Sequence, residues 1–239
     1  MADTTISLII PCYRDEACLA DLLASLRQLP SATTDALQII VVDGANNPAC
    51  RELCQQFDAL WLAAAPCRGE QLRLGAANAS HCLLWFLHAD AQLEGDPLPA
   101  VRAALNSGAT GGYFAFRFAG PGCWQGRLIE HLTNWRTRSG IPYGDQGLFV
   151  RAAAYQQAGQ HSPWPLFEEV ALIRGLRRQG ALVQLKHGLR VDPRRWQRDG
   201  WWWRSLRNRL FALAHRLGVP ASTLARRYGP ATIPEKAPE

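Results

Sequence analysis

Charged and polar side chains follow each of the first four apolar runs of the sequence, where predicted strands end. In chain order they are Tyr13, Glu16, Asp43, Arg68, His88 and Asp90. Carboxylates suit the hydroxyls of a ribose or the edge of a base, a guanidinium suits a phosphate, and Asp90 beside His88 suits a hard metal ion. A single carboxylate after a strand is more often a turn or helix cap. Their repetition on one predicted edge favours a binding site.

The elements that must position these side chains form a repeating strand and helix pattern. Apolar runs predict strands at residues 6–10, 38–42, 60–64 and 82–87. Pro11 is expected to end the first strand. Leucines at helical spacing within 19–26, and the pair Asn47 and Pro48 at a helix start, predict helices between the strands. Strands that are apolar throughout are buried on both faces, as in a parallel sheet, and ligands bind outside the carboxyl ends of such strands.

The second half of the chain predicts further helices at 97–106, 124–137 and 168–179, and a strand at 146–150. Residues 113–118 alternate phenylalanine with other residues. This period of two predicts a half-exposed strand, antiparallel at the far side of the sheet. No linker separates two domains.

Several nucleotide and hydrolase motifs are absent from the sequence. It has no P-loop, and the glycines of 120–126 miss the dinucleotide fingerprint by one residue. It has no G-x-S-x-G elbow and no H-E-x-x-H helix. These absences disfavour P-loop enzymes, nicotinamide dehydrogenases, serine hydrolases and zinc proteases.

Seven short motifs occur in an order that resembles family-2 glycosyltransferases across residues 6–228. They are Leu8–Glu16, Val41–Gly44, Arg68–Gln71 with Asn78, Leu87–Asp90, Pro142–Gly147, Glu168–Val170 and Arg194–Trp196. They look most like the bacterial subgroup associated with radical-SAM or selenodomain proteins. The resemblance implies an α/β fold of the GT-A type, with a mixed, mostly parallel sheet flanked by helices. It divides the chain into a GT-A domain (1–196, with a nucleotide-binding half 1–95 and an acceptor half 96–196), a basic, tryptophan-rich helical extension (197–230) and a disordered tail (231–239).

The resemblance also implies roles for the strand-end residues. Pro11, Tyr13 and Glu16 line a nucleoside pocket, Asp43 holds the base or ribose, and Arg68 lies near the nucleotide. Asp90 takes the place of the last Asp of the D-x-D metal motif, which implies a divalent cation, Mn²⁺ or Mg²⁺. His88 replaces the first Asp. It is either a metal ligand, which Mn²⁺ tolerates better than Mg²⁺, or a structural histidine.

The same resemblance implies catalytic residues in the second half. Glu168-Glu169 stands where the family has a Glu-Asp pair, so Glu169 is the candidate general base, and Glu168 is interpreted as a helix cap. Arg195 either stabilises the departing diphosphate or is a surface arginine, and Trp196 either stacks on a sugar or packs in the core. Processive relatives carry Gln where Asp192 stands, so polymer synthesis is not implied. Asp145 and Gln146 are placed at the donor sugar or acceptor, with a turn-forming role as the alternative for Asp145.

Charge divides the chain into two parts. Residues 1–173 carry 11 Lys and Arg against 16 Asp and Glu, whereas residues 174–239 carry 15 against 4. This split excludes a uniformly basic nucleic-acid binder, and nucleic acid is not expected as a partner. Seven cysteines without a C-x-x-C pair, no basic leader and no apolar run long enough for a membrane span predict a reduced, cytoplasmic protein.

The basic part contains a predicted amphipathic helix over residues 201–217. Its leucines recur at steps of four, three and four, with arginines between them. Such a stripe usually packs on a core, which leaves the arginines solvated or near a diphosphate. The alternative is an interfacial anchor on anionic lipid at the inner face of the cell membrane, with a lipid-linked acceptor.

The sequence therefore predicts an enzyme that moves a sugar from a nucleoside diphosphate sugar to a hydroxyl acceptor with inversion. Two alternatives remain open. A nucleotidyltransferase of related fold is disfavoured because the loop after the first strand is not glycine-rich. A non-catalytic membrane- or nucleotide-binding module derived from a transferase is favoured by His88 and Asp192 at altered motif positions.

Overall fold

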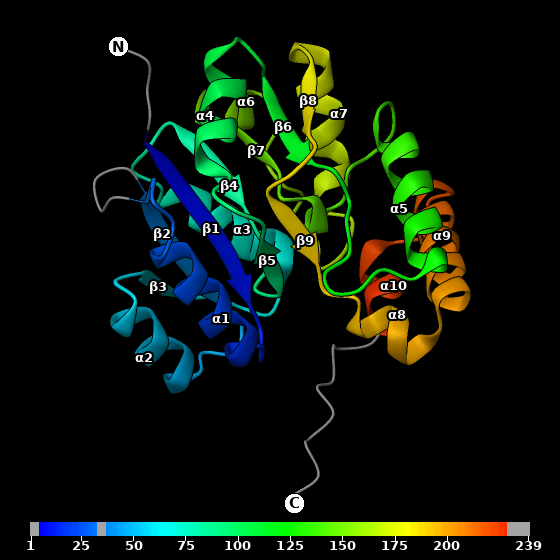
Figure 1. The fold of residues 1–239 in the computed structure, drawn as a ribbon, viewed down its shortest axis with the longest axis horizontal. Coiled ribbons are helices and arrows are strands. Elements are labelled where there is room, and N and C mark those ends of the chain that lie inside the picture. The colour runs from blue at the N-terminus through cyan, green and yellow to red at the C-terminus, as the bar shows by residue number, and fades with distance from the viewer. Residues whose placement is uncertain (1–4, 33–36, 229–239) are drawn as a thin grey trace, which may run out of the picture.

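A computed structural model describes residues 5–32 and 37–228 of the chain, and the predicted tail 231–239 lies outside them. Within these residues a seven-stranded sheet has the order β3-β2-β1-β4-β7-β6-β8 (Figure 1). The strands are β1 (Ile6–Cys12), β2 (Leu37–Asp43), β3 (Leu60–Ala63), β4 (Leu83–Phe86), β6 (Gly111–Phe114), β7 (Phe149–Arg151) and β8 (Leu182–Leu185). The first four are parallel, β7 is antiparallel to both of its neighbours, and β8 is parallel to β6. The predicted mixed, mostly parallel sheet is confirmed.

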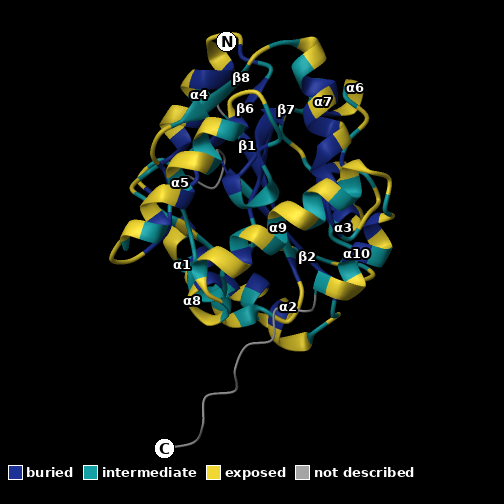
Figure 2. Cartoon of the chain, turned by 90° about the vertical axis from the view of Figure 1, so that its right-hand side faces the viewer, coloured by how far each residue is buried: buried dark blue, intermediate teal, exposed yellow. Residues whose placement is uncertain are grey.

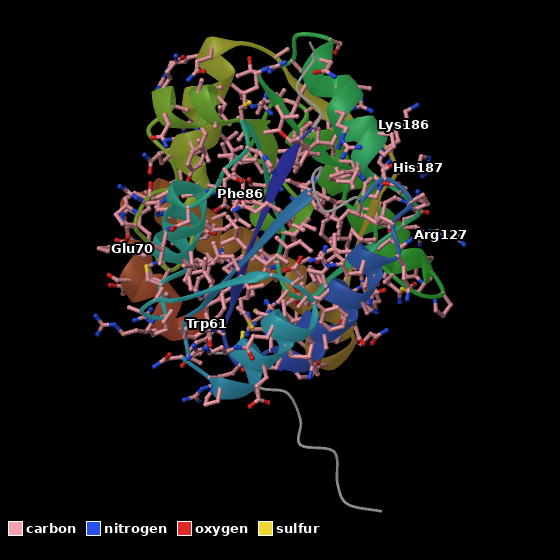
Figure 3. The ribbon with its side chains drawn as sticks, turned by 90° about the vertical axis from the view of Figure 1, so that its left-hand side faces the viewer. Trp61, Glu70, Phe86, Arg127, Lys186 and His187 are labelled. Atoms are coloured by element: carbon pink, nitrogen blue, oxygen red, sulfur yellow. The ribbon has the colours of Figure 1, made fainter. Side chains whose placement is uncertain are left out.

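Helices cover both faces of the sheet, as its apolar strands require. One face packs against α1 (Glu16–Arg27), α2 (Pro48–Gln56) and α4 (Leu98–Asn106). The other packs against α3 (Arg68–Ala77), α6 (Ala152–Gln157) and α7 (Glu169–Gln179). Phe86 of β4 lies inside this second core, whereas Arg127, Lys186 and His187 point outward at the rim of the molecule (Figure 3).

The remaining elements lie beside the carboxyl ends of the strands. A two-stranded antiparallel sheet joins β5 (Ala91–Leu93) to β9 (Leu189–Val191), and a short 3₁₀ turn covers Gly144–Gln146. The other helices are α5 (Trp124–Thr137), α8 (Arg194–Asp199), α9 (Trp201–Arg216) and α10 (Ala221–Tyr228). In the described part of the chain, no helix combines the length and the apolar character that a membrane span needs.

Two strand predictions were wrong in detail. Pro11 does not end β1, which continues to Cys12. Leu87 N–H donates to the Ile9 carbonyl, so the backbone of Ile9, and that of Pro11 two residues later, is directed toward β4. Pairing between β1 and β4 ends before Pro11, so no hydrogen bond is lost because proline has no N–H. The predicted half-exposed strand 113–118 is instead the fully buried β6, ending at Phe114. The alternating phenylalanines Phe116 and Phe118 continue beyond it into a separate aromatic cluster.

Candidate active site

Two adjoining pockets open at the carboxyl ends of the strands, as predicted. The β1 pocket is bounded by the end of β1 and the residues that follow it, including Pro11, Tyr13 and Asp15. The α7 pocket is bounded by the start of α7, the 3₁₀ turn and the C-terminal helices. The two pockets share the residues Arg68, His88, Asp90, Leu166, Arg195 and Tyr228. The shared set contains most of the predicted phosphate and metal ligands, so one extended ligand can occupy both pockets.

An ion pair between the partly exposed Arg68 and the buried Glu168 connects α3 to α7 at the boundary of the two pockets. Arg68 donates from Nε and Nη2 to the two carboxylate oxygens of Glu168, at 2.5 and 2.9 Å. Burial alone would raise the pKa of Glu168, but the charge and hydrogen bonds of Arg68 outweigh it and hold the pKa below its ordinary value. Glu168 occupies the N-cap position of α7, as predicted, but its side chain makes no capping hydrogen bond and binds Arg68 instead.

Close backbone packing brings this pair together. The N–H of Gly69 donates to the Trp164 carbonyl at 2.9 Å, and a Cβ at Gly69 would lie 1.9 Å from the Ser162 carbonyl oxygen. Only glycine allows α3 to begin so close to the loop that leads into Glu168. Arg68 thus reaches Glu168 because the next residue is Gly69.

Glu169, the predicted base, lies next to this pair and lines the α7 pocket. Glu169 is 3% exposed, and its Oε2 atom has no hydrogen-bond partner within the part of the chain that the structure describes. Burial first, and then the charge of Glu168, raise the pKa of Glu169 well above its ordinary value of 4.5. A carboxylate with a raised pKa and one oxygen free to accept a hydrogen bond is a suitable proton acceptor for a hydroxyl.

Asp90 and the start of α8 form a charged cluster shared by both pockets. Arg194 Nη2 lies 3.2 Å from Asp90 Oδ2 and 3.0 Å from Asp15 Oδ2, and Arg195 Nη2 lies 3.8 Å from Asp90 Oδ2. Burial would raise the pKa of Asp90, but His88 and the two arginines lower it overall, so the carboxylate is ionised. Arg195, the predicted diphosphate ligand, therefore lies at Asp90, the predicted metal carboxylate.

His88 approaches the 3₁₀ turn so closely that a Cβ on Gly144 would lie 2.5 Å from its Nε2 atom. This Nε2 is buried and has no hydrogen-bond partner among residues 5–32 and 37–228. Burial, with the charge of Arg68, lowers the pKa of His88 to about 4, so its imidazole is neutral at neutral pH. A neutral imidazole and the ionised Asp90 are two suitable cation donors.

The donor set is small for a protein-only metal site. Among residues 5–32 and 37–228 no group of three or more His, Cys, Asp or Glu side chains is arranged to hold an ion. Mg²⁺ and similar cations are often held by one or two carboxylates and completed by substrate phosphates. Asp90 and His88 fit a cation of that kind.

The remaining predicted site residues divide into pocket and framework positions. Asp145 lines the α7 pocket, and burial raises its pKa to about 6. Trp196 also borders this pocket, but its ring packs against Phe116 and Phe118 and its Nε1 donates to Ser205 Oγ at 3.1 Å. The structure therefore favours the packing alternative for Trp196.

Asp43, Glu16 and Gln146 border neither pocket. The two oxygens of Asp43 accept the backbone N–H groups of Ala45 and Asn47 at 2.8 and 2.6 Å. Glu16 accepts from the Asn47 side chain at 2.6 Å. Gln146 is buried and donates to the Phe114 carbonyl at 2.9 Å. These three residues shape the loops around the pockets, and their predicted contacts with a ligand stay predictions.

The C-terminal helices supply pocket residues that the sequence interpretation missed. Arg204, Asn208, Phe211 and Tyr228 line the α7 pocket. Arg204 is 3% exposed and donates to the Tyr228 hydroxyl at 2.8 Å and to Asp199 at 3.1 Å. Residues 204, 208 and 211 recur at helical spacing opposite the leucine stripe. This spacing is the sequence pattern that indicates a second, buried face of the helix.

The leucine stripe of α9 does not pack on the core, so the interpretation that usually holds for such stripes was wrong here. Leu206, Leu210, Leu213 and Leu217 are 50–77% exposed. The opposite face of α9, through Phe211 and Ala212, packs on the cluster that contains Phe167 and Val170 of the α7 region.

Comparison with known proteins gives a consistent result. The family model "Glycosyl transferase family 2" matches residues 7–154, and no curated protein matches the sequence. Among solved structures, glucosyl-3-phosphoglycerate synthase from Mycobacterium tuberculosis is 20% identical with a TM-score of 0.61, covering 92% of this chain and 82% of its own. A mannosyltransferase from Pyrobaculum calidifontis, in complex with GDP-mannose and Mn²⁺, is 14% identical with a TM-score of 0.63, covering 95% and 71%.

TarS from S. aureus is 15% identical with a TM-score of 0.55, covering 79% of this chain but 36% of its own. Against the TarS 1–349 structures the chain spans 58–61% of their length. At these identities the similarity establishes the fold, and the predicted GT-A fold is confirmed. TarS has been crystallised with UDP-GlcNAc, and the mycobacterial synthase with Mn²⁺ and UDP.

Proposed function

Because the chain belongs to glycosyl transferase family 2, we propose that it transfers a sugar from a nucleoside diphosphate sugar to a hydroxyl acceptor, with inversion at the anomeric carbon. The observation that carries this proposal is Glu169: a buried carboxyl group with a raised pKa, whose Oε2 atom has no hydrogen-bond partner among the described residues, in the pocket that also holds Asp90 and Arg195. Membership of the bacterial radical-SAM-associated subgroup stays a prediction, supported by the order of the motifs.

The two pockets suggest how the substrates divide. The nucleoside is proposed to occupy the β1 pocket, over Pro11 and Tyr13, and the sugar with its acceptor the α7 pocket. The diphosphate then lies at the shared boundary, where Arg68 and Arg195 offer guanidinium groups that bind phosphate oxygens and stabilise the charge of the leaving group. Leu166 and Tyr228 also border both pockets and exclude water from this boundary.

Glu169 would take the proton from the acceptor hydroxyl while that oxygen attacks the anomeric carbon from the face opposite the diphosphate. The C1–O bond to the acceptor forms as the C1–O bond to the diphosphate breaks, and the nucleoside diphosphate leaves with the electron pair. A divalent cation held by Asp90 and His88 would neutralise part of the diphosphate charge when bound. Arg194 holds Asp90 and Asp15 in place at this point.

The experiment for the proposed function is a thermal-shift screen of the purified protein with uridine, guanosine and thymidine diphosphates and their sugars, with and without Mn²⁺. A nucleoside diphosphate that raises the melting temperature, and whose sugar form is slowly hydrolysed, supports the transferase. If no nucleotide shifts the melting temperature under any of these conditions, the proposal is wrong and a non-catalytic module remains.

The pH dependence follows from the raised pKa of Glu169. The turnover rate should rise as pH passes through that pKa, because only the carboxylate accepts a proton. The free energy of unfolding should change with pH in the opposite direction. Because the pKa of Glu169 is higher in the native than in the unfolded state, stability is lost as pH rises from about 4.5 through the native pKa. Steady-state rates and urea unfolding between pH 5 and 8 measure the two trends, and a turnover rate that falls over this range contradicts the assignment.

Asp90→Asn tests the cation site by a readout other than activity. Loss of a residue that only supports a metal ligand typically weakens metal binding roughly 10–100-fold, so removing the ligand itself should weaken Mn²⁺ binding by at least that much. Electron paramagnetic resonance with nucleoside diphosphate present measures the Mn²⁺ affinity. Without Mn²⁺ the variant should bind diphosphate as well as the wild type or more tightly, because Arg195 loses its ion pair with Asp90 and Arg194 loses one of its carboxylate partners. Asp21→Asn, on the exposed side of α1, is the matched control. Unchanged Mn²⁺ affinity would remove Asp90 from the site.

A further inference from the structure

The exposed apolar side chains of this protein are concentrated on one surface. Thirteen large hydrophobic residues are exposed in the described part of the chain, and ten of them belong to α5, α9 and Leu217 just after α9. Trp124 and Trp135 of α5 are 65 and 69% exposed, and Trp203 of α9 is 60% exposed. Figure 2 shows both helices on the side of the molecule that faces the viewer. We name these ten residues the α5–α9 face.

The two helices present this face as one continuous surface. They lie side by side in Figures 1 and 2, and the Trp124 and Trp202 rings are 5.7 Å apart between centroids. A Cβ on Gly126 would lie 3.1 Å from the Trp201 ring, so α5 and α9 are in close contact. The inner face of α9 packs against the protein through Phe211, which contacts a core cluster, and through the buried Arg204. The leucines on its outer face are therefore exposed although the helix is packed in place. Monomeric proteins rarely leave so large an apolar surface uncovered.

The charges around the face have one sign. Arg209 and Arg216 lie between the exposed leucines of α9. Four further arginines are exposed on α5, directly after it and on α10: Arg127, Arg138, Arg226 and Arg227. No Asp or Glu occurs from residue 200 to 228. The one acidic residue of α5, Glu130, is half-buried and accepts the Phe118 N–H at 2.7 Å. The covering surface must therefore be anionic as well as apolar.

We infer that the α5–α9 face docks on the surface of an anionic lipid bilayer. Tryptophan is favoured at headgroup depth, leucines bury among the acyl chains, and each arginine gains from the negative surface potential. A second copy of this chain fits less well, because a two-fold interface would bring together two faces that both carry positive charge.

Docking would place a membrane directly outside the helix that lines the active-site pocket. The inner face of α9 contributes Arg204, Asn208 and Phe211 to the α7 pocket, while its outer face carries the leucines. An acceptor hydroxyl carried by a membrane lipid would therefore be within reach of the same structural element. The docking inference itself does not depend on the proposed activity.

Vesicle flotation with the full chain tests the inference. The protein should float with vesicles of phosphatidylcholine containing 30% phosphatidylglycerol and remain behind with phosphatidylcholine alone. Leu206→Gln combined with Leu210→Gln, and separately Arg209→Glu combined with Arg216→Glu, should each lower the partition coefficient by roughly tenfold or more. The matched controls are Leu60→Gln at the β3 edge and Arg174→Glu with Arg178→Glu on α7, and they should float as the wild type does.

Each remaining outcome overturns the inference. These are absence of wild-type flotation, equal flotation with neutral vesicles, and equal losses in the control variants. Sedimentation analysis is run in parallel, and a dimer that only the Leu206 and Leu210 substitutions dissociate would assign the face to a second copy. Thermal shifts with nucleoside diphosphate on the same samples show whether the pocket is intact, so failure of docking is distinguished from failure of the proposed activity.

Discussion

Glu169→Gln should lower the turnover rate of sugar transfer by roughly 10²–10⁴-fold, the contribution typical of a positioned general base. Glutamine has the same shape as the glutamate but does not accept a proton from the acceptor hydroxyl. Nucleoside diphosphate affinity should stay within about twofold, because Glu169 borders the α7 pocket and not the β1 pocket. Single-turnover kinetics with a donor found in the screen, and calorimetric titration of the diphosphate, measure the two quantities.

Folding stability separates this catalytic effect from a structural one. Glu169 is 3% exposed and lies next to the carboxylate of Glu168, so a neutral amide removes an unfavourable buried charge. The free energy of unfolding of Glu169→Gln at neutral pH should therefore equal or exceed that of the wild type. Glu169→Asp keeps a carboxylate, as the family's Glu-Asp pair implies, and should retain more activity than Glu169→Gln.

A turnover rate of Glu169→Gln within threefold of the wild type would remove Glu169 from the mechanism. Asp145 would then be the next candidate, because it is a second carboxyl group of the same pocket with a pKa raised to about 6. Asp145→Asn decides between the two residues, since only the variant that lacks the base should lose its activity at all pH values.

The sheet and the pocket edge could be predicted because their signals are local. An apolar run such as 38–42 contains enough information to predict a doubly buried strand, and in a parallel sheet the residues after each strand share one edge. Arg68, His88 and Asp90 were placed correctly at that edge from this rule alone. The resemblance to the family was needed for Glu169, because an acidic residue at a helix start is equally consistent with a cap.

The parts that escaped prediction depend on contacts between distant segments. Glu168 lies 100 positions after its partner Arg68, and no local pattern indicates that pair. The stripe of leucines on α9 predicted packing by helical periodicity, but the helix turns its Arg204, Asn208 and Phe211 face to the core. Which face of an amphipathic helix is covered depends on the surface that it meets, and that surface is formed by residues near 167 and 196.

The second prediction with a large effect concerns this pair of distant residues. Arg68→Met should lower the free energy of unfolding at neutral pH by about 3 kcal/mol, the lower end of the usual cost of removing one partner of a buried ion pair, because Arg68 itself is 29% exposed. The Glu168 side chain is 1% exposed, so without Arg68 its charge is buried next to Glu169 with no counter-ion. Urea unfolding followed by circular dichroism measures the change, and Arg178→Met on the exposed side of α7 should stay within about 0.5 kcal/mol of the wild type.

The pH dependence of this loss identifies its electrostatic origin. In the wild type the pKa of Glu168 lies below its ordinary value of 4.5, so the pair stabilises the fold above that pH and the stabilisation is lost as pH falls through the native pKa. In Arg68→Met the buried Glu168 should have a raised pKa, so lowering the pH from 7 toward 5 should restore part of the lost stability. Adding Glu168→Leu to Arg68→Met should also restore stability, since two apolar side chains replace the unpaired charge. A loss that is equal at pH 7 and pH 5, and unchanged in the double variant, would mean that Arg68 stabilises the fold by packing and not by its charge.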